Sequence, residues 1–231
     1  MNVALPASIF VSVLKYLTVS KLVEVSSGLL FTFSAVGICY AVAYLAVILF
    51  KVPAGRRGTL INMFANANTI FIGLPLNTAL FGQVSISYYL VYYITNTIST
   101  WAIGALIIGQ DSKEPQKNKQ AKFDWKKLLP APLIRFLVSL VFLFLNIPVP
   151  TFATNTLTYL GNIVTPLSLI YIGIVLSKAG LSSIKIDKDT LLALGGRYLV
   201  SPIVMWVILL LFGSSLKSVE SNTFLIQSAV P

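Results

Sequence analysis

The sequence consists of long apolar stretches separated by short polar segments, and this pattern limits the fold more than any other feature. Inside a bilayer no water can satisfy the backbone, so only helices and closed barrels span it, and a helix needs about 20 mostly apolar residues. The apolar stretches lie at residues 2–19, 28–50, 58–80, 85–108, 131–147, 156–177, 190–212 and 221–231. They predict an all-α polytopic membrane protein with about eight transmembrane helices, surrounded by the lipid bilayer.

The composition excludes much enzyme chemistry. Only 10% of the residues are charged, whereas a soluble domain has about 25%. Histidine is absent and Cys39 is the single cysteine, which excludes His-based catalysis, zinc sites of the Cys/His type and an intrachain disulfide. All Asp and Glu residues fall in polar segments or at the ends of apolar stretches, so no intramembrane carboxylate relay is expected within this segment. The sequence therefore predicts no enzyme and no cofactor.

The basic residues predict the orientation in the membrane. The net charge is +10, and the Lys and Arg residues form short clusters rather than a continuous stripe, which favours a membrane surface over nucleic acid. Fourteen of them fall on one side of the predicted spans, and only Lys15, Lys21 and Lys217 fall on the other. Because basic short loops stay in the cytoplasm, we expect the basic connector at 109–130 to be cytoplasmic and residues 18–27 to face outward in a cell-membrane protein.

Two signatures recur in the two halves of the chain, at 1–108 and 131–231. In the first signature Asn and Pro are four residues apart, at Asn2/Pro6 and Asn162/Pro166. In the second they are nine residues apart, at Asn66/Pro75 and Asn222/Pro231. The matching stretches are an odd number of spans apart, so the two halves would enter the membrane from opposite sides. The pattern therefore predicts an inverted repeat, as many secondary carriers have.

The third stretch concentrates features that disfavour a straight helix. Asn66, Asn68, Thr69, Gly73 and Pro75 lie within ten residues, and a proline in a helix removes one amide donor and clashes with the preceding turn. Non-helical backbone at membrane depth persists only where it lines a cavity or is buried in protein. We expect a break near Gly73–Pro75 whose freed backbone groups and helix N-terminus can hold a small anion. A proline-kinked packing helix is the alternative.

The counterpart stretch is expected to break at Pro231 and to cross the third stretch at mid-membrane. The predicted substrate site is this crossover, and its candidate residues are Asn66, Asn68, Thr69, Gly73, Pro75, Asn222, Gln227 and Pro231. Pro6 and Pro166 are predicted to mark further helix breaks. Arg197 is the one cation that could lie inside a span; snorkelling of its long side chain to the cytoplasmic interface is the favoured interpretation, and a counter-ion for an organic anion is the alternative.

Several runs of residues together resemble the auxin efflux carrier family of membrane transport proteins, which includes bacterial permeases for malate and malonate. The runs are NVALPASIF, NANTIFIGLPL, LGNIVTPLSLIYIGIVLSKAGL and FLIQSAVP, in this order along essentially the whole chain. The resemblance implies ten spans in two inverted five-span repeats, similar to sodium/proton antiporters and bile-acid symporters, with broken helices in the fourth and ninth positions. On that template 1–108 supplies spans two to five and 131–231 supplies spans six to nine, the last incomplete.

The resemblance implies a secondary transporter for a small organic anion such as a dicarboxylate, working by alternating access. It leaves a coupling ion, H+ or Na+, and a homodimer open. A channel-like subunit or a truncated paralogue that does not transport is the alternative. A membrane-embedded enzyme is disfavoured because no catalytic constellation is present.

Overall fold

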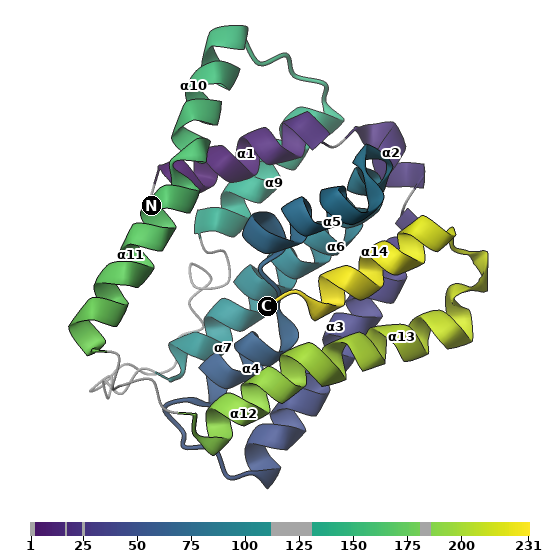
Figure 1. Ribbon diagram of the computed structural model, residues 1–231. Helices are drawn as coiled ribbons and strands as arrows, with labels where there is room; N and C mark the ends of the chain where they lie inside the picture. Colours follow the sequence, from purple (N-terminus) through teal and green to yellow (C-terminus); the bar gives the residue numbers. More distant parts are fainter. Residues whose placement is uncertain (1–2, 17, 25, 112–130, 181–185) are drawn as a thin grey trace, which may run out of the picture. The chain divides into compact units, whose positions relative to one another are not determined.

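The computed structural model describes residues 3–16, 18–24, 26–111, 131–180 and 186–231. Every regular element in these ranges is a helix, and each predicted apolar stretch coincides with one helix or with a run of consecutive helices (Figure 1). Helices of a length and composition that fit a membrane crossing occur at Ser26–Leu49, Ile86–Gly109 and Lys188–Ser215. The prediction of an all-α polytopic membrane protein is thereby confirmed. Residues 112–130 of the predicted connector lie outside the described residues.

The chain divides into two compact units, and the first comprises residues 1–23 and 131–187. Its main helices are α1 (Ala4–Tyr16), α9 (Ala131–Phe144), α10 (Thr151–Asn162) and α11 (Val164–Ala179). α1 packs against both α9 and α10. The rings of Phe10 and Phe142 meet edge to face with centroids 5.2 Å apart. A Cβ on Gly161 would lie 2.9 Å from the Cα of Ser8, so this glycine permits the close approach of α10 to α1.

The second unit comprises residues 24–130 and 188–231. Its first half contains α3 (Ser26–Leu49), α4 (Arg57–Ala65), the π-helical turn η1 (Thr69–Gly73), α5 (Leu74–Phe81), α6 (Ile86–Ile98), the π-helical turn η3 (Ser99–Gly104) and α7 (Ala105–Gly109). Its second half contains α12 (Lys188–Gly195), the π-helical turn η5 (Gly196–Val200), α13 (Ser201–Phe212) and α14 (Ser218–Ala229). α13 packs along both α3 and α14 (Figure 1).

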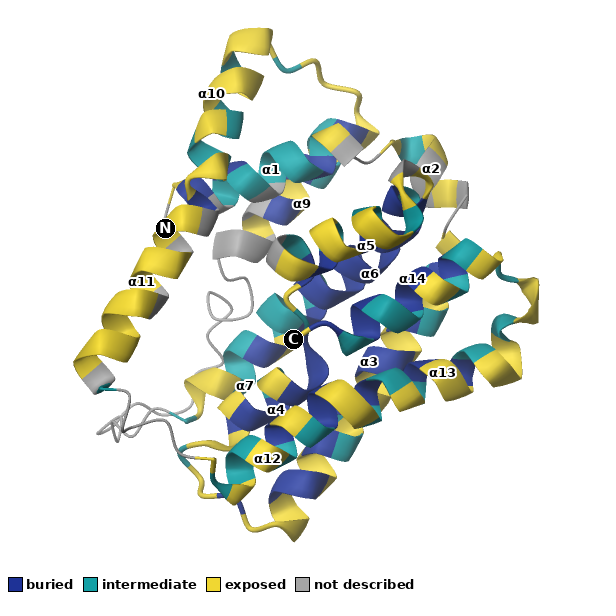
Figure 2. Cartoon of the chain, viewed as in Figure 1, coloured by how far each residue is buried: buried dark blue, intermediate teal, exposed yellow. Residues whose placement is uncertain are grey.

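Burial in the second unit follows the pattern expected for a membrane bundle. Figure 2 shows α6 almost entirely buried, and its residues Tyr88–Thr97 are all in the buried class. In contrast, α13 ends in Leu210, Leu211 and Phe212, each about two-thirds exposed on the isolated chain. Lipid tails are as apolar as leucine, so large apolar side chains are stable on the lipid-facing outside of a bundle. We therefore assign this face of α13 to the bilayer.

The division into units does not follow the two sequence halves, because each unit takes helices from both. The stretches that share the first Asn/Pro signature lie in the first unit, and those that share the second lie in the second unit. Stretches related by the predicted repeat therefore belong to the same unit. The inverted repeat itself stays a prediction.

The prolines of the first signature lie at helix starts. Pro6 occupies the first turn of α1, where its missing amide would have had no partner, so it does not interrupt that helix. Pro166 lies in the first turn of α11, and α10 ends just before it, at Asn162. In a continuous helix the amide of residue 166 would bond to the carbonyl of Asn162, so a boundary at this point is the expected effect of proline.

Candidate functional site

The third stretch is interrupted earlier than we predicted. α4 ends at Ala65, Asn66 is extended with φ −104° and ψ 151°, and helical structure resumes only at Thr69. The expected break at Gly73–Pro75 is wrong, because Gly73 closes η1 and Pro75 lies in the first turn of α5. A π-helical turn is wider than an α-helical one, and η1 directly before α5 accommodates the missing proline amide.

The freed backbone at the break is held by two side chains of α6. The amide of Ala67 donates to Oδ1 of Asn96, and Nδ2 of Asn96 donates back to the carbonyl of Ala67, both at 2.8 Å. The hydroxyl of Tyr89 donates to the carbonyl of Thr69 at 3.1 Å. These bonds satisfy backbone groups that would otherwise be costly to bury. Side chains of α6 therefore stabilise the interrupted backbone.

Asn66 holds the break from the side of α4. Its Nδ2 donates to Oη of Tyr40 at 2.5 Å and to Oδ1 of Asn62 at 2.8 Å. Its Oδ1 accepts a hydrogen bond of 2.6 Å from the hydroxyl of Ser99. Both amide donors of Asn66 are used, so in this conformation the side chain supports the break and does not point a donor at a ligand.

The interruption after α4 meets the end of α14. This helix ends at Ala229, and Val230 is extended with φ −68° and ψ 138°. The carbonyl of Pro231 accepts a hydrogen bond of 2.6 Å from the amide of Asn68, so the interruption after α4 contacts the residues that follow α14. One turn inside α14, Nε2 of the fully buried Gln227 donates to the carbonyl of Gly73 at 2.9 Å.

The structure thus brings most of the predicted site residues together, and it leaves out Asn222. Asn222 is exposed, and Nδ2 of its side chain donates to Oγ of Ser218 on the same helix at 3.5 Å. The spacing that aligned Asn66 with Asn222 therefore does not correspond to the geometry, because Asn66 lies at a break and Asn222 lies near the start of α14.

The burial of Arg197 contradicts the favoured interpretation that its side chain snorkels to the cytoplasmic interface. Arg197 is only 3% exposed, and its guanidinium lies where the end of α4 meets the end of α14. Nε donates to the carbonyl of Val230 at 2.5 Å, Nη2 donates to that of Gln227 at 3.0 Å, and Nη1 donates to that of Ala65 at 3.3 Å. Nη1 also lies 3.4 Å from Oγ of Ser201. The cation therefore lies inside the second unit and contacts the ends of both α4 and α14.

Each of the three π-helical turns in the described ranges contributes a residue to the contacts around the interruption after α4 and the end of α14. η1 supplies Thr69, η3 supplies Ser99 and η5 supplies Arg197. Gly196 lets η5 approach α4, since a Cβ there would overlap the ring of Phe64. Single π-helical turns in α-helices are frequent at functional sites, and here they aim polar groups at one place.

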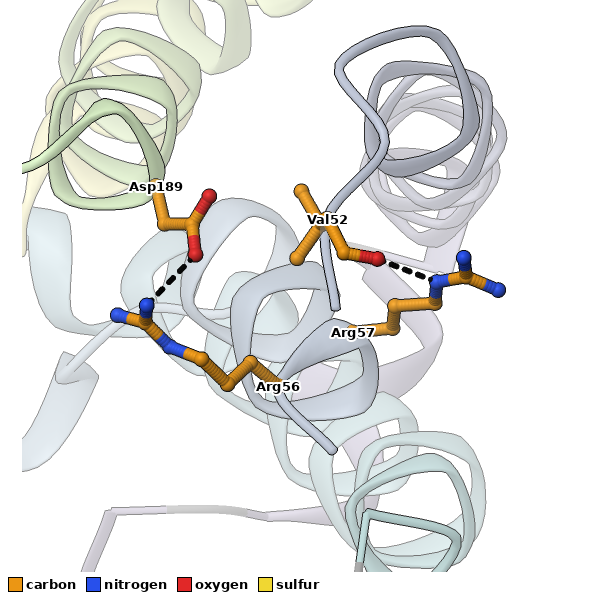
Figure 3. A network of polar contacts seen from close by, with 4 residues as sticks. All are labelled: Val52, Arg56, Arg57 and Asp189. Carbon is orange, nitrogen blue, oxygen red and sulfur yellow. Dashed lines mark hydrogen bonds and ion pairs between the residues drawn. The ribbon is translucent and has the colours of Figure 1, made fainter. Parts of the chain in front are cut away.

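A polar cluster lies at the opposite end of α4. The carboxylate of Asp111 accepts hydrogen bonds from the amides of Gly58 at 3.0 Å and Thr59 at 2.7 Å. Figure 3 shows two further contacts there: Nη1 of Arg56 lies 2.8 Å from Oδ2 of Asp189, and Nε of Arg57 donates to the carbonyl of Val52. The start of α4, the end of α7 and the start of α12 therefore share one end of this unit.

One carboxylate at a helix end is buried. Glu220 falls in the first turn of α14, at a helix end as expected, but it is only 6% exposed. Its Oε1 lies 3.0 Å from the position that a Cβ on Gly28 would take. It is the only carboxylate in the buried class among the residues that the structure describes.

The second unit is a helical membrane bundle in which the interruption of the third stretch meets the end of α14, and interrupted helices are common in secondary transporters. The family described as "Membrane transport protein" matches residues 1–231, and the chain belongs to this family. An uncharacterized transporter of Methanocaldococcus jannaschii is 25% identical over 239 residues, which cover 99% of this chain and 73% of that protein. The predicted resemblance is thereby confirmed, and the family is one of membrane transporters and not of enzymes.

Proposed function

We propose that this chain carries a small organic anion, such as a dicarboxylate, across the cell membrane by alternating access at the crossover. The observation that carries the proposal is the hydrogen bond from the amide of Asn68 to the carbonyl of Pro231. It joins the interruption of the third stretch to the residues that follow α14, in the other half of the chain, and carriers with discontinuous helices build a substrate site near mid-membrane from such elements.

The polarity of the helix ends favours an anion. The helical run formed by η1 and α5 starts at Thr69, directly after the break, and its first amides form the positive end of that run. Such an end attracts negative charge, and the attraction is stronger away from water. Asn68 is exposed at the same place, and its side-chain amide is a donor that suits a carboxylate.

The charge distribution of the second unit supports the predicted orientation. Lys51, Arg56, Arg57 and Lys188 are exposed and belong to the end of this unit where α4 and α12 begin. This end continues at Asp111 into the basic connector. Because cytoplasmic loops carry the excess of Lys and Arg, we assign this end to the cytoplasm.

The test is uptake into proteoliposomes that contain the 231-residue chain. Radiolabelled malate, malonate and succinate are offered outside, with glycine and glucose as matched uncharged or zwitterionic controls. A carrier gives uptake of a dicarboxylate that saturates with concentration and is accelerated by unlabelled substrate inside. Linear, unsaturable flux would favour the channel, and flux equal to that of empty vesicles for all anions would reject transport of these substrates.

A further inference from the structure

Arg197 is a buried cation whose partners are not carboxylates. Among the described residues, its guanidinium donates to three backbone carbonyls and to the hydroxyl of Ser201, and the hydroxyl of the buried Tyr92 lies beside it. A charge that is taken out of water is costly unless other charges or dipoles compensate it. The groups that compensate the charge of Arg197 therefore indicate its role.

The three carbonyls all belong to helix C-termini. Ala65 is the last residue of α4, Gln227 lies in the last turn of α14, and Val230 follows the end of α14. The last four carbonyls of a helix have no partner within that helix, and together with the aligned peptide dipoles they give its C-terminus a charge of about −0.5. Two such ends converge on one guanidinium, so they supply about −1 against its charge of +1.

We propose that Arg197 is the positioning residue of the crossover: its guanidinium holds the C-termini of α4 and α14 together and cancels their negative charge, and it does not bind the substrate directly. The donor geometry fits this role, because a guanidinium presents several N–H groups in a fixed fork and can bridge acceptors from different elements. With Arg197 in place the two helix ends carry no excess negative charge, and the positive start of η1 is left to attract an anion.

The consequence for transport rests on the function proposed above, whereas the role in holding the crossover does not. Without the guanidinium, two negative helix ends would face each other and the break would open. This opening occurs in the protein without any substrate. A substrate counter-ion, in contrast, would leave the substrate-free crossover unchanged when it is replaced.

The test measures how accessible the break is in the substrate-free chain. Ala67→Cys is introduced in a Cys39→Ala background, and its alkylation by a small maleimide is followed in vesicles of neutral lipid. We expect Arg197→Gln to raise the alkylation rate about tenfold, which corresponds to about 1.4 kcal/mol of opening free energy. Arg197→Lys keeps the charge but loses the fork, so its alkylation rate should lie between those of the parent and of Arg197→Gln, at about threefold or more above the parent, which corresponds to about 0.65 kcal/mol.

The outcomes separate the two roles. An unchanged alkylation rate in Arg197→Gln, together with loss of dicarboxylate uptake, would overturn the proposal and make Arg197 a substrate counter-ion. If Arg197→Gln does not fold, the alkylation rate in Arg197→Lys decides. A rate about threefold or more above that of the parent, which corresponds to about 0.65 kcal/mol, supports the positioning role. A rate equal to that of the parent overturns it. Failure of the uptake experiment with a raised alkylation rate would reject the proposed substrate and leave the role of Arg197 standing.

Discussion

Gln227 and Gly73 are 154 residues apart in the sequence but lie in direct contact, so close that a methyl group on Gly73 would not fit. Nε2 of Gln227 donates to the carbonyl of Gly73 at 2.9 Å, and a Cβ on Gly73 would overlap the carboxamide oxygen of Gln227. Gln227 is fully buried, so its side chain has little room to move away. The contact therefore fixes α14 against η1 at the crossover.

Gly73→Ala should destabilise the protein because the new methyl group displaces a buried carboxamide and breaks its hydrogen bond. Overpacking of this kind costs about 1 to 3 kcal/mol. Thermal unfolding in detergent should show a lower Tm. Gly37→Ala is the matched control, since a Cβ on this glycine of α3 meets nothing within 4 Å, and removal of a helical glycine stabilises by up to about 1 kcal/mol. Equal Tm values for the two variants would contradict the close contact.

Asn66→Ala should lower stability and transport together. The substitution removes one of the two acceptors of the Ser99 hydroxyl and the hydrogen bonds to Tyr40 and Asn62, and loss of a buried partner costs about 1 to 3 kcal/mol. Asn222→Ala is the matched control, because this exposed asparagine bonds only within its own helix and should stay within about 0.5 kcal/mol. A variant Asn66→Ala with parental Tm but weaker uptake would show instead that Asn66 contacts the substrate.

The sequence predicted an interruption in the third stretch but not its position. Proline and glycine marked the third stretch as irregular, but the break falls at Asn66–Asn68 because Asn96 and Tyr89 satisfy the backbone there. Which side chains of a neighbouring helix reach a given carbonyl depends on packing, and no local pattern specifies it. Tyr89 and Asn96 are seven residues apart on α6, so they share one face; this spacing was the available signal.

Arg197 shows the same limit. A lone arginine in an apolar stretch favours snorkelling when only the distance to the stretch end is known. Its burial follows from two helix ends that the sequence does not place beside it, one in each half of the chain. Charge compensation by backbone dipoles leaves no sequence signature, because any residue supplies the carbonyl.

Asp111→Ala should weaken the start of α4. The carboxylate accepts hydrogen bonds from the amides of Gly58 and Thr59 and from the hydroxyl of Thr59 at 2.9 Å, so it acts as a helix cap supplied from the end of α7. Loss of a capping oxygen costs about 0.5 to 2 kcal/mol. We expect a lower Tm and faster amide hydrogen exchange at 58–60. The neighbouring exposed residue provides the control, since Gln110→Ala should leave both unchanged; equal exchange in the two variants would rule out the cap.

The orientation of the second unit can be tested at two exposed turns. α3 runs from Ser26 to Leu49. Near the start of α3, Gly28 packs against Phe224 of α14. Beyond the end of α3, Arg56 pairs with Asp189 at the start of α12. Ala54, between α3 and α4, and Ser214, between α13 and α14, therefore lie at opposite ends of this unit.

Because the end with Arg56 and Arg57 carries the positive charges, it should face the cytoplasm. In intact cells, a membrane-impermeant maleimide should label Ser214→Cys and not Ala54→Cys, each in a Cys39→Ala background. Permeabilised cells should label both, which shows that each thiol is reactive. Labelling of Ala54→Cys alone in intact cells would place the basic end outside, and with it the connector that follows Asp111.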